Sequence, residues 1–249
     1  MAQLLRAEWR KVRTTRVVYG LLAGSVAFAV LGVVGGILGA GENDSFALET
    51  PEGVRNVFGA AAGGTALLAI LGILGVTNEF RHGTIVPTLL VTPDRARVVG
   101  AKLATFALAG IVFAVVGCAV TIAIAVPWLA ARDIDFSVTS RDVAVPLAGA
   151  VLAFALYGML GVGVGTLIHN QVAAIVITLV WMMIIEGLIV ALLPSVGRWL
   201  PGGALASVIG TANTRGDYLP MWAGAVLLVA YVVAFAVAGT VLTTRRDIR

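Results

Sequence analysis

The chain has 249 residues, 59% of them apolar and only 12% charged, and its mean hydropathy of +1.01 lies far above the range of soluble globular proteins. These values exclude a soluble domain and predict an integral membrane protein. The basic excess, 17 Lys and Arg against 13 Asp and Glu, is too small to indicate nucleic acid as a partner. The single cysteine, Cys118, excludes an internal disulfide and argues against a thiolate metal site.

The N-terminal segment, residues 1–16, is predicted to form an amphipathic helix in the interface of the lipid bilayer. Its apolar positions recur at i, i+4 and i+7, and they are Leu5, Trp9 and Val12. Its adjacent stripe is basic, and it consists of Arg6, Arg10 and Arg13. Such a helix would place its tryptophan at headgroup depth and its arginines near anionic lipid. The alternative is a basic tail that directs topology without folding.

Six apolar runs are long enough to cross a membrane. A hydrocarbon core about 30 Å thick requires roughly 20 residues of helix. The runs that reach this length are 17–40, 57–76, 103–131, 143–168, 172–193 and 221–242. We therefore predict an all-α integral membrane protein with six transmembrane helices in a single transmembrane domain, residues 1–249.

The distribution of Lys and Arg predicts the orientation. If the N-terminus is cytosolic, that side carries five basic residues before the first span, four between spans two and three, and three in the tail. This makes twelve, against five on the other side. By the positive-inside rule, both termini of this multi-pass protein are expected in the cytosol.

A polar insert, residues 77–102, separates the second and third spans. Gly83 is expected to interrupt a helix that leaves the second span. Thr84 is expected to cap a new short helix that starts at Ile85, with Pro87 in its first turn, where the missing N–H is harmless. A short helix that stands off the membrane in the cytosol would suit docking on a partner protein.

The end of this insert contains a second helix-start pattern. Thr92 is predicted to be the N-cap of the third span's helix, with Pro93 at the first helical position. Asp94 would then complement the helix dipole from within the first turn.

The connection between spans five and six, residues 194–220, contains an apolar stretch at 200–209. This stretch is about half the length needed to cross the bilayer. We predict a short re-entrant or surface-lying element, and a simple outer loop is the alternative.

One ionisable residue, Glu186, lies inside a predicted span. A carboxylate in hydrocarbon is unfavourable, so its side chain should face protein or a wet cavity, or be protonated. It is either a candidate residue of a translocation path or a structural residue paired with a neighbouring polar group. The sequence leaves both possibilities open.

The chain lacks the motifs of an enzyme. A phosphate-binding loop places a lysine after a glycine-rich turn, and neither lysine of this chain, Lys11 or Lys102, follows one. The glycines in GVGVG, residues 161–165, are interpreted as permitting close helix packing rather than nucleotide binding. His169 is interpreted as a turn residue between two spans. We therefore expect no catalytic, cofactor-binding or metal-binding residue in this chain.

Three polar segments carry a family resemblance over essentially the whole chain. They are EWRKVRTTR at 8–16, NEFRHGTI at 78–85 and LLVTPDRARVVGAK at 89–102. Together with six spans, these segments resemble the small six-helix permease subunits of type 2 class ABC exporters in the bacterial inner (cytoplasmic) membrane. The resemblance implies a cytosolic coupling helix within 78–92 that sits in a cleft of the ATPase subunit. The coupling residues implied are Glu79, Phe80, Arg81, His82, Gly83, Thr84 and Ile85.

The resemblance also implies the partners. A dimer of ABC ATPase subunits would bind ATP and Mg²⁺, and a second permease subunit, identical or a close paralogue, would form the translocation path. Two other functions are alternatives. One is an ion-coupled secondary transporter that uses Glu186, and the other is a membrane assembly protein without transport activity.

Overall fold

The protein is described by a computed structural model that covers residues 2–40, 46–84, 90, 94–211 and 218–245. Within these ranges the regular secondary structure is helical, and no strand occurs. Among the described residues, six stretches are long and apolar enough to cross a membrane: Arg16–Leu38, Pro51–Arg81, Ala96–Ala130, Arg141–Leu167, Gln171–Leu192 and Met221–Val241. The prediction of six transmembrane helices in an all-helical protein is confirmed at this level.

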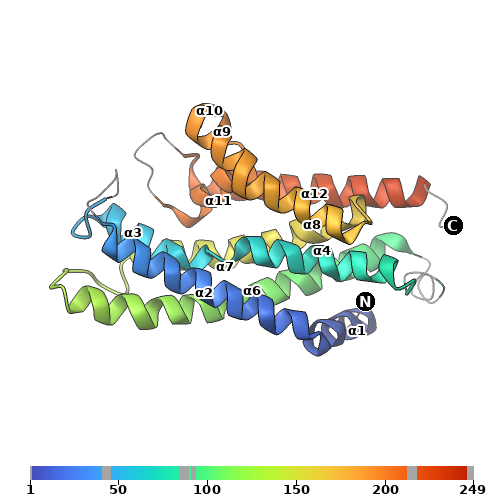
Figure 1. Cartoon of the computed structure of the whole chain (residues 1–249), viewed down its shortest axis with the longest axis horizontal. Coiled ribbons are helices and arrows are strands. Elements are labelled where there is room, and N and C mark those ends of the chain that lie inside the picture. The colour runs from blue at the N-terminus through green and yellow to red at the C-terminus, as the bar shows by residue number, and fades with distance from the viewer. Residues whose placement is uncertain (1, 41–45, 85–89, 91–93, 212–217, 246–249) are drawn as a thin grey trace.

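The helices are α1 (Ala2–Thr14), α2 (Arg16–Leu38), α3 (Pro51–Gly59), α4 (Thr65–Arg81), α6 (Arg95–Ala130), α7 (Arg141–Leu167), α8 (Gln171–Val180), α9 (Glu186–Leu192), α10 (Pro194–Gly197), α11 (Pro201–Ile209) and α12 (Met221–Arg245). A single extended residue, Thr15, separates α1 from α2. In Figure 1, α1, the end of α4, the beginning of α6, the start of α8 and the end of α12 lie at one end of the bundle.

Helix α7 forms the centre of the bundle, and glycines let α4 approach it closely. A Cβ atom on Gly72 of α4 would lie 2.3 Å from the carbonyl oxygen of Gly158. A Cβ atom on Gly161 of α7 would lie 2.0 Å from the carbonyl oxygen of Ala69. No side chain fits at these positions, so the two helices meet backbone to backbone. The packing interpretation of the glycines at 161–165 is thus confirmed for its first member.

The second span differs in length and continuity from the predicted run at 57–76. It comprises α3, a 3₁₀ turn at Ala60–Ala62 and α4, and it begins at Pro51, where the Thr50 side chain accepts a hydrogen bond from the Gly53 N–H. Because α4 continues to Arg81, the first part of the predicted polar insert is the last turn of the second span. Hydropathy could not show this extension, because the last turn of α4 is polar.

Gly83 ends the helical backbone, as expected. Its φ of +66° lies in the left-handed region that glycine adopts without strain. The predicted short helix beginning at Ile85 falls outside the described residues.

The predicted start of the next helix at Thr92 is wrong. Asp94 is the N-cap of α6: its backbone is extended, and its side chain accepts a hydrogen bond from the Arg97 N–H at 3.1 Å. Thr and Asp both cap well, but here the aspartate carboxylate reaches the N–H three residues ahead. Asp94 therefore lies at the boundary of the helix rather than in its first turn.

The apolar stretch between spans five and six forms α11 rather than an irregular loop. Its nine residues are too few to cross a bilayer. Its side chains pack against α7 and α12, and Ala204 and Val208 are buried. The Tyr231 hydroxyl of α12 donates a hydrogen bond to the Trp199 carbonyl at 2.9 Å, which attaches the α10–α11 connection to the last span.

Candidate functional site

Helix α1 packs against the bundle through its apolar face. Val12 is buried, and Trp9 packs beside it on a cluster that includes Phe106 and Phe113 of α6. Leu5 is half-buried. The N-terminal segment is therefore a docked helix, and the unfolded-tail alternative does not hold for Ala2–Thr14.

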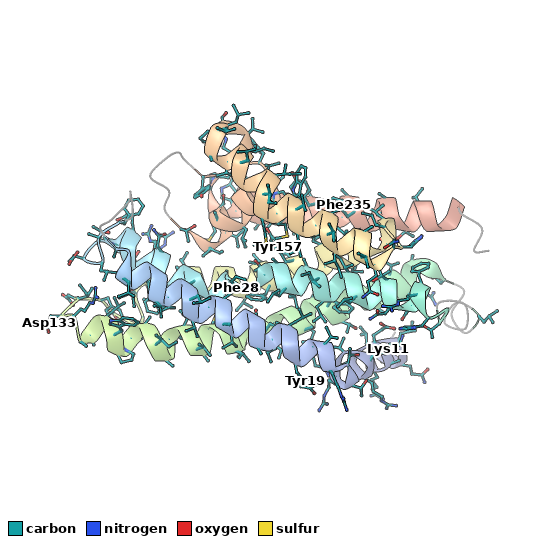
Figure 2. All side chains as sticks on the ribbon, in the orientation of Figure 1. Lys11, Tyr19, Phe28, Asp133, Tyr157 and Phe235 are labelled. Atoms are coloured by element: carbon teal, nitrogen blue, oxygen red, sulfur yellow. The ribbon has the colours of Figure 1, made fainter. Side chains whose placement is uncertain are left out.

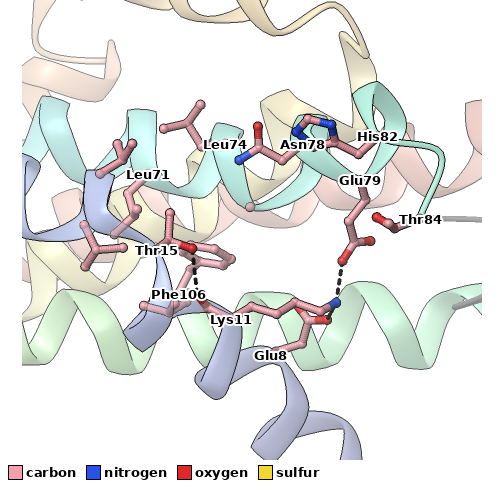
Figure 3. Close-up of a pocket in the computed structure, with 14 residues that line it drawn as sticks. Glu8, Lys11, Thr15, Leu71, Leu74, Asn78, Glu79, His82, Thr84 and Phe106 are labelled. Atoms are coloured by element: carbon pink, nitrogen blue, oxygen red, sulfur yellow. Dashed lines mark hydrogen bonds and ion pairs between the residues drawn. The ribbon is translucent and has the colours of Figure 1, made fainter.

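Four charged side chains meet where α1, α4 and α6 touch. We call Glu8, Lys11, Glu79 and Lys102 the charge cluster. The Lys102 Nζ atom lies 2.9 Å from Glu8 Oε2 and 2.7 Å from Glu79 Oε1. The Lys11 Nζ atom lies 2.6 Å from Glu8 Oε1 and 2.7 Å from Glu79 Oε1 (Figure 3). Two lysines thus bridge two carboxylates that are far apart in the sequence.

The charge cluster is buried and electrically balanced. Lys102, Glu8 and Glu79 are exposed by only 2%, 5% and 6%, whereas the Lys11 side chain is half exposed. The third N–H of Lys102 reaches the Gly75 carbonyl at 3.0 Å, so all three of its donors are used. Buried charges persist only when they are paired in this way. The cluster therefore fixes α1, the end of α4 and the beginning of α6 to one another.

The charge cluster shifts the pKa values of its α1 members. Burial raises the pKa of the Glu8 carboxyl, but the charges and hydrogen bonds of Lys102 and Lys11 outweigh burial and hold that pKa below its usual range. Burial lowers the pKa of the Lys11 ammonium, but its bonds to Glu79 and Glu8 outweigh burial and raise that pKa. Folding therefore favours the charged forms of both groups.

The Glu8 shift predicts a stability contribution that disappears in acid. A carboxyl with a depressed pKa stabilises the fold above its ordinary pKa of about 4.3, and the contribution is lost as the pH falls through the lower folded value. We expect the Tm difference between the protein and its Glu8→Gln variant to be largest near neutrality and to shrink below about pH 4. Thermal unfolding in detergent over a pH series measures it, and a difference independent of pH would contradict the prediction.

A cavity of about 470 Å³ borders the charge cluster. Figure 3 shows Glu8, Lys11 and Glu79 on one side of it, and apolar residues such as Leu71 and Phe106 at its other end. His82 and Thr84 also line it, so the cavity reaches the end of α4. Movement of α4 would therefore change the volume of this cavity.

The predicted coupling residues divide into two groups. Glu79 and Phe80 face inward: Glu79 belongs to the charge cluster, and the Phe80 ring stacks on His169 with centroids 4.0 Å apart. Arg81, His82, Gly83 and Thr84 are exposed, and Ile85 lies outside the described residues. The Arg81 guanidinium donates to the Gln171 side chain at 3.3 Å. The end of α4 is thereby attached to His169, in the turn between α7 and α8, and to Gln171, the first residue of α8.

Sequence reasoning missed four of the residues that hold this site. Glu8, Lys11 and Lys102 were not predicted as partners of Glu79, and His169 was interpreted only as a turn residue. Two signals were present. Glu8 interrupts the apolar face of α1 with a charge, and Lys11 and Lys102 are the only lysines in the chain.

Glu186 occupies a separate buried position. Its side chain is 4% exposed and accepts a hydrogen bond from the Gly202 backbone N–H, in the first turn of α11. A π-helical stretch, Trp181–Ile185, immediately precedes it in the fifth span. The sequence left two roles open for Glu186. The hydrogen bond from Gly202 supports the structural role, in which the carboxyl pairs with a neighbouring polar group. A place on a translocation path stays a prediction.

The helical fold, the six apolar spans and the polar end of α4 define a multi-pass membrane protein. The family model described as ABC-2 family transporter protein matches residues 4–186, which is more than half of the chain. The chain belongs to this family and is a permease of the ABC-2 type. The match includes every member of the charge cluster. A search among curated proteins gave no match for the chain.

Proposed function

We propose that this chain is the membrane-spanning permease subunit of an ATP-driven exporter in the bacterial inner membrane. Family membership supports an ABC transporter context, in which the energy source is a separate ATPase. In this proposal the ATPase subunits bind ATP and Mg²⁺, and the permease itself is not an enzyme and holds no cofactor. Both termini face the cytosol, α1 lies in the inner interface, and α11 is re-entrant.

The attachment of the end of α4 supports a coupling role for residues 78–92. Exposed side chains at Arg81, His82 and Thr84 offer a contact surface for an ATPase subunit. Directly behind them, the charge cluster joins α4 to α1 and α6, and Phe80 joins it to the α7–α8 turn. A force applied at this surface would therefore move several helices together. In this scheme Glu79 acts by holding the coupling segment, not by touching the ATPase.

The fifth span supports a dimer. Only 11% of its most apolar stretch is buried within the chain, against 72% for the second span. Large side chains including Val176, Met183 and Ile184 are exposed there. We propose that a second permease subunit, identical or closely related, covers part of this surface, with the translocation path between the two copies.

Charge reversal at the exposed coupling surface tests the proposal. We expect Arg81→Glu to weaken binding of the ATPase subunit to the permease by about tenfold, because reversing a charge at an interface replaces an attraction by a repulsion. The Tm of the isolated permease should change little, because this side chain is exposed. Binding of the ATPase subunit to permease in nanodiscs measures the effect.

The matched control is Arg97→Glu, which reverses an exposed charge near the start of α6. This control should bind the ATPase subunit nearly normally. Equal binding by Arg81→Glu and the unaltered protein would refute the coupling surface.

Glu186→Gln separates the exporter from the ion-coupled alternative. The substitution keeps an oxygen that can accept the Gly202 N–H hydrogen bond to α11, and we expect stability to change by no more than about 1.5 kcal/mol. Vanadate-sensitive ATPase activity of the assembled complex should persist. Proton-dependent uptake without an ATPase partner, abolished by Glu186→Gln, would instead establish a secondary transporter.

A further inference from the structure

A groove with a basic half and an apolar half runs along the exposed face of α1 and then between α2 and α6. The basic half has a volume of about 410 Å³, and its charged lining residues are Arg6, Arg10 and Arg13. The apolar half has a volume of about 210 Å³ and is lined by residues such as Leu22 and Val112. The halves share Trp9, Arg13 and Tyr19. They are adjoining parts of one cavity system, which we call the amphiphilic groove.

The arginines of the groove have no acidic partner within the described part of the chain. Spaced at i, i+4 and i+7, they lie along one face of α1. The ion pairs of α1 are formed by Glu8 and Lys11, which lie on another face of the helix. The basic half therefore presents three guanidinium groups to a ligand from outside the chain.

The groove lies where a membrane span begins. Tyr19 is in the first turn of α2, at its junction with α1 (Figure 2), and its hydroxyl donates a hydrogen bond to the Arg13 carbonyl at 3.0 Å. Tyrosine and tryptophan favour the headgroup region of a bilayer. From this level the apolar half continues along α2 and α6, towards the hydrocarbon. The order of basic, aromatic and apolar surface matches the order of chemistry along a phospholipid.

We propose that the amphiphilic groove binds one anionic phospholipid, with its phosphate on the arginines and an acyl chain in the apolar half. Guanidinium groups form paired hydrogen bonds with phosphate oxygens. A soluble anion would satisfy the basic half alone and would leave the apolar half without a partner. The site lies on a different face of α1 from the charge cluster, and it does not depend on the proposed function.

Lipid titration tests the site. The full chain, delipidated in detergent, is titrated with phosphatidylglycerol or phosphatidylcholine, and native mass spectrometry counts the bound lipids. Both lipids carry the phosphate, but only phosphatidylglycerol has a net negative charge, and attraction between anionic lipid and a basic residue is worth about 1 kcal/mol per residue. We therefore expect one phosphatidylglycerol to bind about tenfold or more tightly than phosphatidylcholine. Equal binding of the two lipids would overturn the proposal.

Arginine variants locate the headgroup. Arg10→Gln/Arg13→Gln should weaken phosphatidylglycerol binding by about tenfold or more. Arg97→Gln/Arg141→Gln removes the same charge elsewhere and should retain the lipid. Equal losses in both double variants would show a general charge effect and would overturn the proposed site.

A substitution in the apolar half distinguishes a lipid from a soluble anion. Val112 is exposed in the groove, and Val112→Trp should fill the space for the acyl chain and weaken lipid binding. Val115→Trp, one turn away on α6 and also exposed, should not. Glycerol 3-phosphate should compete poorly. Full displacement of the lipid by glycerol 3-phosphate, with no effect of Val112→Trp, would identify an anion site and refute the lipid.

Discussion

Replacing Lys102 by methionine is expected to lower the free energy of unfolding by about 3–5 kcal/mol, the range for breaking a buried ion pair by removing one partner. The substitution keeps most of the side-chain volume, but it leaves Glu8 and Glu79 with only Lys11 between them. Lys102 is 2% exposed, so water cannot replace its ammonium group. Thermal or denaturant unfolding of the purified protein in detergent measures the loss.

Two further variants separate this effect from a general loss of charge. Arg97→Met removes an exposed cation from the same helix and should change stability by less than about 1 kcal/mol. Adding Glu8→Gln to Lys102→Met restores the charge balance of the cluster and should recover part of the loss. Wild-type stability in Lys102→Met would show that the charge cluster does not hold these helices together.

Gly161→Val is expected to destabilise the bundle by about 3 kcal/mol or more, beyond the usual range for overpacking. The new Cβ atom would begin 2.0 Å from the Ala69 carbonyl oxygen, which belongs to helix backbone and cannot rotate away. Helices α4 and α7 would have to separate along their contact. A lower Tm, together with faster hydrogen exchange in both helices, would show that the two helices have separated.

The control for this substitution is Gly35→Val in α2. A Cβ atom at that glycine would meet no heavy atom within 4 Å beyond its own helix backbone and its chain neighbours. We expect a change of less than about 1 kcal/mol, which reflects helix propensity alone. Equal effects of the two variants would mean that the α4–α7 contact is looser than the structure shows.

The six spans could be predicted because length and hydropathy are local properties of the sequence. The helix stop at Gly83 was predictable for the same reason, since a positive φ favours glycine. The N-cap of α6 was not predictable, because Thr92 and Asp94 are both suitable capping residues. The structure shows that Asp94 is the one used. The hydropathy pattern also predicted too early an end for the second span, because hydropathy falls where a helix continues with polar residues.

The candidate site was only partly predictable. Glu79 was assigned to the coupling segment by resemblance, but its inward direction depends on Glu8 and Lys102, which lie 71 and 23 positions away in the sequence. Only the packing of α1, α4 and α6 brings these residues together. The same is true of the stacking between Phe80, in the last turn of α4, and His169, in the turn between α7 and α8.

The central claim is that the end of α4 is the surface on which the ATPase subunit docks. Cys118 is the only native cysteine, so a Cys118→Ser background permits single-site cross-linking. In membranes that contain the complete transporter, a maleimide photo-cross-linker is attached to Thr84→Cys or to Asp135→Cys, at the opposite end of the bundle. We predict a cross-link to the ATPase subunit from Thr84→Cys and none from Asp135→Cys. A cross-link from Asp135→Cys alone would contradict the account.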